Sequence, residues 1–248
     1  NVAVERGNFN IVKFFLYSLK NQDIYWPSLF ENEIKPTHYG IIELFLYHGN
    51  DVNMSLDGKT LLYCCIGENN LEIIELLLKK KANPNIKTST GDFPLLLATR
   101  EQYVDIVKCL IENNADVNLF DMNGETALSV AIKLRNVEIV KILIEHGADV
   151  NALDHCDASP IFIAACHGHW EIFKILVENG AELDNLDYLN QSLIMYAITG
   201  QNTDIIKFLC ESSDCLYDED YKSRTPLYCA LKHDNDEIIK VLIENGSD

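Results

Sequence analysis

The sequence predicts an all-α solenoid in which short helix–turn–helix units stack one after another. Three observations carry this prediction. The segment from Asp121 to Asn151 recurs with a shift of 33 residues, and its next copy opens at Asp154. A fixed period of this length is typical of repeat proteins. Each period also holds two apolar segments with helical spacing, and in most copies a Gly or Asn follows the second of them.

The first, inner helix of each unit is expected to begin at one column of the repeat. That column contains Thr60, Phe93, Thr126, Ser159, Ser192 and Thr225. A Thr or Ser hydroxyl at this place can accept a hydrogen bond from a free N–H group of the first helical turn. Proline follows in three copies, where its missing N–H is not needed.

The second, outer helix is marked by an isoleucine column with the same spacing. Its members are Ile73, Ile106, Ile139, Ile172, Ile205 and Ile238, and each opens an apolar run. Such a broad apolar face indicates a helix packed between neighbours, with Lys141 and Glu145 on the outward side. Gly147 and Gly180 follow two of these helices, where the left-handed backbone conformation ends a helix.

This repeating unit resembles the ankyrin repeat, most closely in Gly124, Thr126-Ala127-Leu128, Glu138-Ile139-Val140 and Gly147-Ala148-Asp149-Val150-Asn151. The resemblance implies helix pairs joined by β-hairpin-like fingers, and a concave surface made of fingers and inner helices. We expect one domain over residues 1–248, with about seven to eight repeats and truncated ends. Six regular repeats occupy 55–248, and degenerate repeats occupy 1–54, with weaker matches at 3–12, 27–34 and 39–46. Because the chain opens at Asn1 inside a repeat, we expect it to be a piece of a longer protein.

Two columns depart from the family pattern. The family's inner-helix His is replaced by Tyr63, Leu96, Ser129, Phe162, Met195 and Tyr228, so apolar packing has to replace its hydrogen bonds. The finger glycine is present as Gly58, Gly91 and Gly124 and then becomes Asp157, Asn190 and Ser223. Asp and Asn tolerate a positive φ better than most residues, but we expect the later fingers to differ in shape from the earlier ones.

Composition narrows the classes of partner. A net charge of −18 repels phosphate backbones and anionic lipid, which disfavours nucleic acid and membrane surfaces and favours a basic or mixed-charge protein. No apolar run is long enough to span a membrane. The eight cysteines have no disulfide framework spacing, which favours an intracellular, reducing compartment with the cytoplasm as the expected location. We expect a monomeric array.

Reactive residues occur, but their spacing favours a structural interpretation. Cys166-His167-Gly168-His169 has spacing that a metal ion can use, yet a zinc site needs about four converging ligands. Adjacent residues on a helix also point apart, which disfavours a Cys166–His167 nucleophile pair. No Gly-rich phosphate loop is present. The sequence therefore predicts no enzyme, no cofactor and no metal.

The function implied by the resemblance is non-catalytic binding of a partner protein on the concave surface. An alternative is a recruiting or targeting arm of a larger enzyme, channel or pathogen effector. The residues expected to contact a partner are those that vary while the repeat frame stays fixed: Met122, Asn123, Glu125, Lys133, Leu134, His155, Cys156, His167, Trp170, Tyr188, Leu189, Tyr221, Lys222 and Arg224. The resemblance also implies asparaginyl hydroxylation, with Asn151 as the first candidate and Asn118 as the second.

Overall fold

The computed structural model describes residues 38–47, 49, 51–56, 58–212 and 215–246. The chain divides into two compact units, unit 1 from Asn1 to Met122 and unit 2 from Asn123 to Asp248. The single domain expected over residues 1–248 stays a prediction. The weak copies expected at 3–12 and 27–34 lie outside the described residues.

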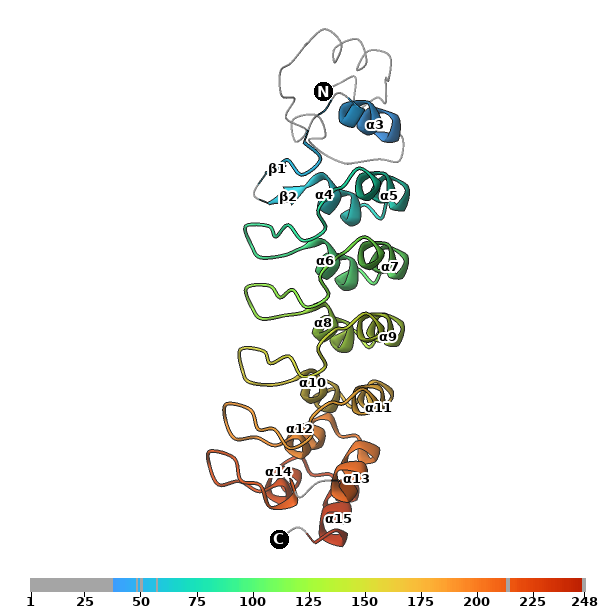
Figure 1. Cartoon of the computed structure of the whole chain (residues 1–248). Helices are drawn as coiled ribbons and strands as arrows, with labels where there is room; N and C mark the ends of the chain where they lie inside the picture. Colours follow the sequence, from blue (N-terminus) through green and yellow to red (C-terminus); the bar gives the residue numbers. More distant parts are fainter. Residues whose placement is uncertain (1–37, 48, 50, 57, 213–214, 247–248) are drawn as a thin grey trace. The chain divides into compact units, whose positions relative to one another are not determined.

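Unit 1 contains helix pairs connected by extended loops (Figure 1). Helix α3 (Tyr39–Tyr47) lies where the sequence predicts an outer helix. Strands β1 (Ser55–Leu56) and β2 (Lys59–Thr60) form a short antiparallel hairpin, in which Ser55 is opposite Thr60. The pairs that follow are α4 (Leu61–Gly67) with α5 (Leu71–Lys79), and α6 (Pro94–Arg100) with α7 (Val104–Glu112).

Unit 2 continues the same pattern through four helix pairs. These pairs are α8 (Ala127–Lys133) with α9 (Val137–Glu145), α10 (Pro160–Cys166) with α11 (Trp170–Glu178), α12 (Leu193–Gly200) with α13 (Thr203–Ser212), and α14 (Pro226–Lys232) with α15 (Asp236–Glu244). A 3₁₀ turn, η3 (Cys215–Tyr217), precedes the last pair. Inner helices contact inner helices and outer helices contact outer helices along the unit. The predicted all-α solenoid is confirmed.

The core of unit 2 lies between successive helix pairs. The outer-helix isoleucines Ile139, Ile172 and Ile205 are fully buried. Phe162 and Met195, which stand where the family pattern has His, are also buried between inner helices. The Phe162 ring meets the Tyr196 ring edge-on, with ring centroids 5.1 Å apart. At these two positions apolar packing replaces the hydrogen bonds of the family's histidine, as the sequence indicates. At Ser129 and Tyr63 the expectation is wrong, because the Ser129 hydroxyl accepts the Thr126 amide and the Tyr63 hydroxyl donates to Asp92.

The predicted inner-helix caps are confirmed in part. Thr126 forms a capping box with Ser129, and the Thr225 hydroxyl accepts a hydrogen bond from the Tyr228 amide. The expected hydroxyl caps at Ser159 and Ser192 are wrong, because neither side chain makes a capping hydrogen bond. In both helices the amide that a capping hydroxyl would bind, three residues later, donates instead to the carbonyl of the serine itself.

An asparagine between consecutive repeats fixes the spacing of unit 2. The Asn151 amide group donates to the Gly180 carbonyl at 3.0 Å and accepts from the Glu182 backbone N–H, also at 3.0 Å. Tyr217 takes the equivalent position two repeats later and donates its hydroxyl to the Gly246 carbonyl. These bonds hold the loop after one outer helix against the loop after the next. The loops between the repeats are therefore carried on a regular frame.

Candidate functional site

The loops that precede the inner helices of unit 2 share one hairpin geometry. We call residues 153–158, 186–191 and 219–224 the fingers of unit 2. In each, an aspartate opens a tight turn: Asp187 Oδ1, for example, accepts the backbone N–H groups of Leu189 and Gln191. The Asn190 amide donates to the Asp187 carbonyl, and the Asp187 amide donates to the Gln191 carbonyl. Hairpin loops of this kind consist of a type I turn followed by one left-handed residue.

The expectation that the later fingers differ in shape is wrong at the left-handed position. The φ angles of Asp157, Asn190 and Ser223 are 56°, 56° and 52°, in the same left-handed region as the finger glycines. The aspartate that opens each turn forms hydrogen bonds that hold this conformation, so a non-glycine residue can occupy it. The change of residue type alters the side chain at the tip and leaves the turn intact.

The carboxylates of Asp187 and Asp220, which open two of the turns, form hydrogen bonds with residues of their own repeats. Asp187 Oδ2 accepts the Tyr196 hydroxyl at 2.8 Å, and burial, followed by this hydrogen bond, raises the pKa of Tyr196. Burial of Asp220 opposes its ionisation. The hydrogen bond from the Arg224 guanidinium and two backbone amides outweigh that effect, so the pKa of Asp220 lies below its usual value. These carboxylates stabilise the turns and are not placed for general acid–base chemistry.

Neighbouring finger tips are joined through their backbones. The Tyr188 amide donates to the Cys156 carbonyl at 3.2 Å, and the Tyr221 amide donates to the Leu189 carbonyl at 3.0 Å. The His155 ring lies against Gly124, because a Cβ added to that glycine would be 3.2 Å from the ring. The tips therefore present their side chains from a fixed backbone, which lowers the entropic cost of binding.

Large apolar side chains are exposed along these fingers. The exposed fractions are 60% for Tyr188, 53% for Tyr221, 56% for Leu153 and 43% for Leu186. Together with the exposed His155, these residues form what we call the finger row. Exposed aromatic residues on a rigid scaffold are the residue types that dominate protein interfaces. The finger row is the strongest candidate site among the described residues of unit 2.

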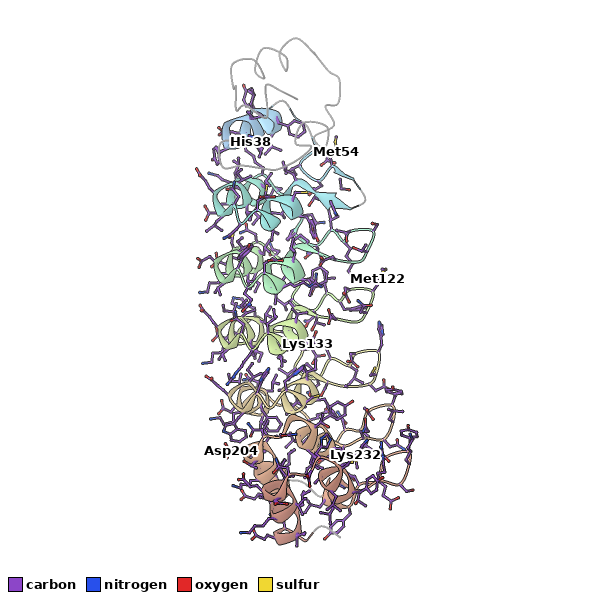
Figure 2. All side chains as sticks on the ribbon, turned by 180° about the vertical axis from the view of Figure 1, so that it is seen from behind. His38, Met54, Met122, Lys133, Asp204 and Lys232 are labelled. Carbon is purple, nitrogen blue, oxygen red and sulfur yellow. The ribbon has the colours of Figure 1, made fainter. Side chains whose placement is uncertain are left out.

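The carboxyl ends of the inner helices adjoin the fingers. Lys133 at the end of α8 forms an ion pair with Glu125 at 2.6 Å, and Leu134 beside it is 39% exposed. The exposed His167 stacks on His169, with ring centroids 5.5 Å apart. Figure 2 shows Lys133 and Lys232 on the inner-helix side of unit 2, and Asp204 on the outer-helix side.

Most of the predicted contact residues are accessible where the sequence places them. Asn123, Cys156 and Lys222 are exposed on the fingers, and the Lys222 ammonium group lies 4.9 Å from the centroid of the Tyr221 ring. Leu189 is half-buried, and Arg224 is half-buried because it pairs with Asp220. Their roles in binding stay predictions.

Met122 belongs to unit 1 and is described separately from the finger row. It is 66% exposed, and Figure 2 shows it at the tip of its finger. Its side chain also covers Gly91, because a Cβ added there would be 2.6 Å from Met122 Cγ. Phe120, in the same finger, is 54% exposed. Unit 1 thus has exposed apolar residues in the same columns of the repeat.

Trp170, which the sequence places just before an outer helix, lies away from the fingers, and its role in binding stays a prediction. Trp170 is the first residue of the outer helix α11, and its ring packs between Phe173 and Phe208, with centroids 5.9 and 6.0 Å away. The Lys174 ammonium group covers the ring at 5.3 Å. Its unusual position in the sequence reflects packing between neighbouring outer helices.

Sequence reasoning missed Leu153 and Leu186, as it missed Phe120 in unit 1. All three stand two residues before the tip residue of their finger, in one column of the repeat. An apolar residue repeated at an exposed loop position is the signal that would have found them. The sequence indicated Asn151 only as a candidate for hydroxylation. In the structure its side-chain amide also makes two hydrogen bonds to the next repeat. Hydroxylation of Asn151 or Asn118 stays a prediction.

Charge is divided unequally between the two sides of unit 2. Five Lys or Arg and seven Asp or Glu lie on the fingers and inner helices, which are residues 123–135, 153–168, 186–201 and 219–234. Three of those seven acids are the aspartates that open the turns. Four Lys and thirteen Asp or Glu lie on the described outer helices and the loops after them, which are residues 136–152, 169–185, 202–212, 215–218 and 235–246. The acidic surface of this unit is therefore the outer-helix surface.

Reactive side chains are not gathered into a site within the described part of the chain. No group of three His, Cys, Asp or Glu residues there is placed to hold a metal ion. Burial raises the pKa of the Cys166 thiol, which is the opposite of what a nucleophile needs. Among the same residues, no helix has the length and apolar character needed to cross a membrane.

Stacked helix pairs with rigid, exposed loops define a helical-repeat protein whose surface is built for recognition. A family model described as ankyrin repeats, in three copies, matches residues 1–88, 33–121, 82–154, 118–187 and 161–248. The chain belongs to the ankyrin-repeat family. Ankyrin repeats are generally protein–protein interaction modules and generally non-catalytic. A search of curated proteins found no match for this chain.

Proposed function

We propose that this protein is a non-catalytic module that binds a partner protein on the fingers and adjoining inner helices of unit 2. The observation that carries the proposal is the finger row, in which Tyr188 and Tyr221 are more than half exposed on hydrogen-bonded tips. Burial of such side chains supplies most of the binding free energy in protein interfaces, at roughly 25 cal/mol per Å² of apolar surface. A fixed backbone lets that gain appear as affinity.

The outer-helix side and the finger side of unit 2 differ in charge, and we expect them to contribute differently to binding. The acidic outer helices attract a basic or mixed-charge partner from a distance and accelerate its association. Contact at the finger row is mainly apolar and aromatic, because the carboxylates of Asp187 and Asp220 are used in the turns. Charge therefore controls the rate of encounter, and the finger row controls how long the complex lasts.

The test compares partner capture by the wild-type protein and by the double variant Tyr188→Ala, Tyr221→Ala. Ile243→Ala is the matched control, because Ile243 is 56% exposed in the same unit but lies on the outer helix α15, away from the fingers and inner helices. We expect the double variant to lose captured proteins that the control retains, with thermal unfolding unchanged in both. Retention of every captured protein by the double variant would refute the assignment of the site.

A further inference from the structure

The spacing of the finger row restricts the conformation of a segment that lies along it. Equivalent residues in neighbouring fingers are separated by one repeat, and packed helices are about 8–10 Å apart. The bonds from Tyr188 N–H to the Cys156 carbonyl and from Tyr221 N–H to the Leu189 carbonyl keep the tips at a similar separation. A bound segment must therefore present one side chain to each finger about every 8–10 Å.

Three regular conformations can be compared with this interval. A polyproline II helix has three residues per turn and rises 3.1 Å per residue, so every third side chain points the same way at intervals of about 9 Å. A β-strand presents the same face every second residue, at about 6.6 Å or about 13 Å. An α-helix comes close only after seven residues, at about 10.5 Å.

The width of the finger row separates the two conformations that match. An amphipathic α-helix needs a broad apolar groove, because its i, i+3, i+4 and i+7 residues all make contact. The finger row is narrow, since the exposed polar residues Asp157, Asn190 and Ser223 lie next to it on the tips. A polyproline II segment makes one contact per turn and fits a narrow row.

The chemistry of the finger row matches the same segment. Polyproline II has no internal hydrogen bonds, so its carbonyl groups need external donors. The tip residues Tyr188, Tyr221 and Lys222 are exposed and carry hydroxyl and ammonium donors. Flat aromatic rings also pack well on proline rings, which is how aromatic-lined grooves recognise such segments. The low net charge of the fingers and inner helices, five Lys or Arg against seven Asp or Glu, complements an uncharged segment, in contrast to the acidic outer helices.

We propose that the finger row binds a proline-rich segment of the partner in the polyproline II conformation, with an apolar side chain at every third residue. Successive side chains are received by Leu153, by Leu186 together with Tyr188, and by Tyr221, one on each finger. The phenol hydroxyls bind the carbonyl groups between them. This inference rests on the proposed function and narrows the class of partner that the module recognises.

The experiment measures fluorescence anisotropy with two uncharged, end-capped peptides of twelve residues. One is (Leu-Pro-Pro)₄, and the other is an amphipathic helix of matched Leu content. We expect (Leu-Pro-Pro)₄ to bind the wild-type protein more tightly than the helical peptide does. Its affinity should fall by about tenfold or more in the Tyr188→Ala, Tyr221→Ala variant, as expected for loss of aromatic anchors. It should stay unchanged in the outer-helix variant Ile243→Ala.

The outcomes separate this inference from the proposed function. Tighter binding of the helical peptide, lost in the double variant, would overturn the polyproline assignment and leave the finger row as the binding surface. Failure of (Leu-Pro-Pro)₄ to bind would also overturn it. Equal binding of (Leu-Pro-Pro)₄ to wild type and double variant would overturn it too, because contact would then lie elsewhere. The proposed function falls separately, when partner capture is insensitive to the double substitution.

Discussion

Replacement of Gly200 by alanine tests whether close approach of the inner helices sets the geometry of unit 2. Gly200 ends helix α12, and a Cβ built there would be 2.1 Å from the Ala165 carbonyl oxygen and 2.9 Å from the Cys166 carbonyl oxygen. Both neighbours are backbone atoms of the α10 end, so they cannot rotate away. Overpacking of this kind costs about 1–3 kcal/mol.

The opposing contribution is helix propensity. Alanine is favoured over glycine in a helix interior by about 1 kcal/mol, and by less at a helix end. The clash exceeds that gain, so we expect Gly200→Ala to lower the free energy of unfolding by about 1–2 kcal/mol. Gly67→Ala is the matched control, since Gly67 also ends an inner helix and a Cβ there meets nothing within 4 Å. It should be neutral or slightly stabilising.

Urea unfolding followed by circular dichroism measures both variants. If Gly200→Ala raises the midpoint as much as Gly67→Ala does, propensity dominates and the close approach of α10 and α12 does not constrain the unit. If Gly200→Ala alone lowers the midpoint at constant slope, the constraint is confirmed as a change in stability.

Three further outcomes are expected. Ile198→Ala should lower the free energy of unfolding by about 2–5 kcal/mol, because Ile198 is fully buried. Leu231→Ala in the same column should lower it by less than about 1 kcal/mol, because Leu231 is 57% exposed. Chemical denaturation measures both. Asn151→Ala removes the bond to the Gly180 carbonyl and should cost about 1–2 kcal/mol, seen as faster amide exchange in that loop. Burial lowers the pKa of His169 in the folded protein below the value of about 6.5 that the side chain has in the unfolded chain. The stability that neutral His169 contributes is therefore complete above pH 6.5, and it is lost as the pH falls through the pKa of the folded state. His169→Gln should flatten the loss of thermal stability between pH 7 and pH 5; an unchanged slope would show that another group is responsible.

Periodicity alone predicted the helices of the described repeats, because each helix is a local consequence of its apolar spacing. The Ile139 and Ile172 columns are buried as expected, and Pro160 occupies the first helical position. The Ser159 and Ser192 caps were mispredicted, since a cap depends on whether a hydroxyl or a carbonyl reaches the free amide. That choice depends on the rotamer of the side chain and the local backbone, which residue type does not determine.

The candidate site was predictable where exposure follows from a loop position. Tyr188 and Tyr221 were found because they stand at the tips and break the repeat pattern. Trp170 was expected at the start of an outer helix, where it could contact a partner or pack on a neighbouring repeat, and its ring contacts Phe208 of the next outer helix. Leu153 and Leu186 were missed since an isolated leucine in a loop is indistinguishable from a core residue until burial is known.

Site-specific photo-crosslinking tests most directly that the fingers of unit 2 are the binding surface. A benzophenone amino acid replaces Leu186 in the finger row in one protein, and Lys207, an exposed residue of the outer helix α13, in another. Both proteins are irradiated with the same captured partner. We expect a covalent adduct from position 186 and none from position 207. An adduct confined to position 207 would contradict binding at the fingers and place the partner on the outer helices.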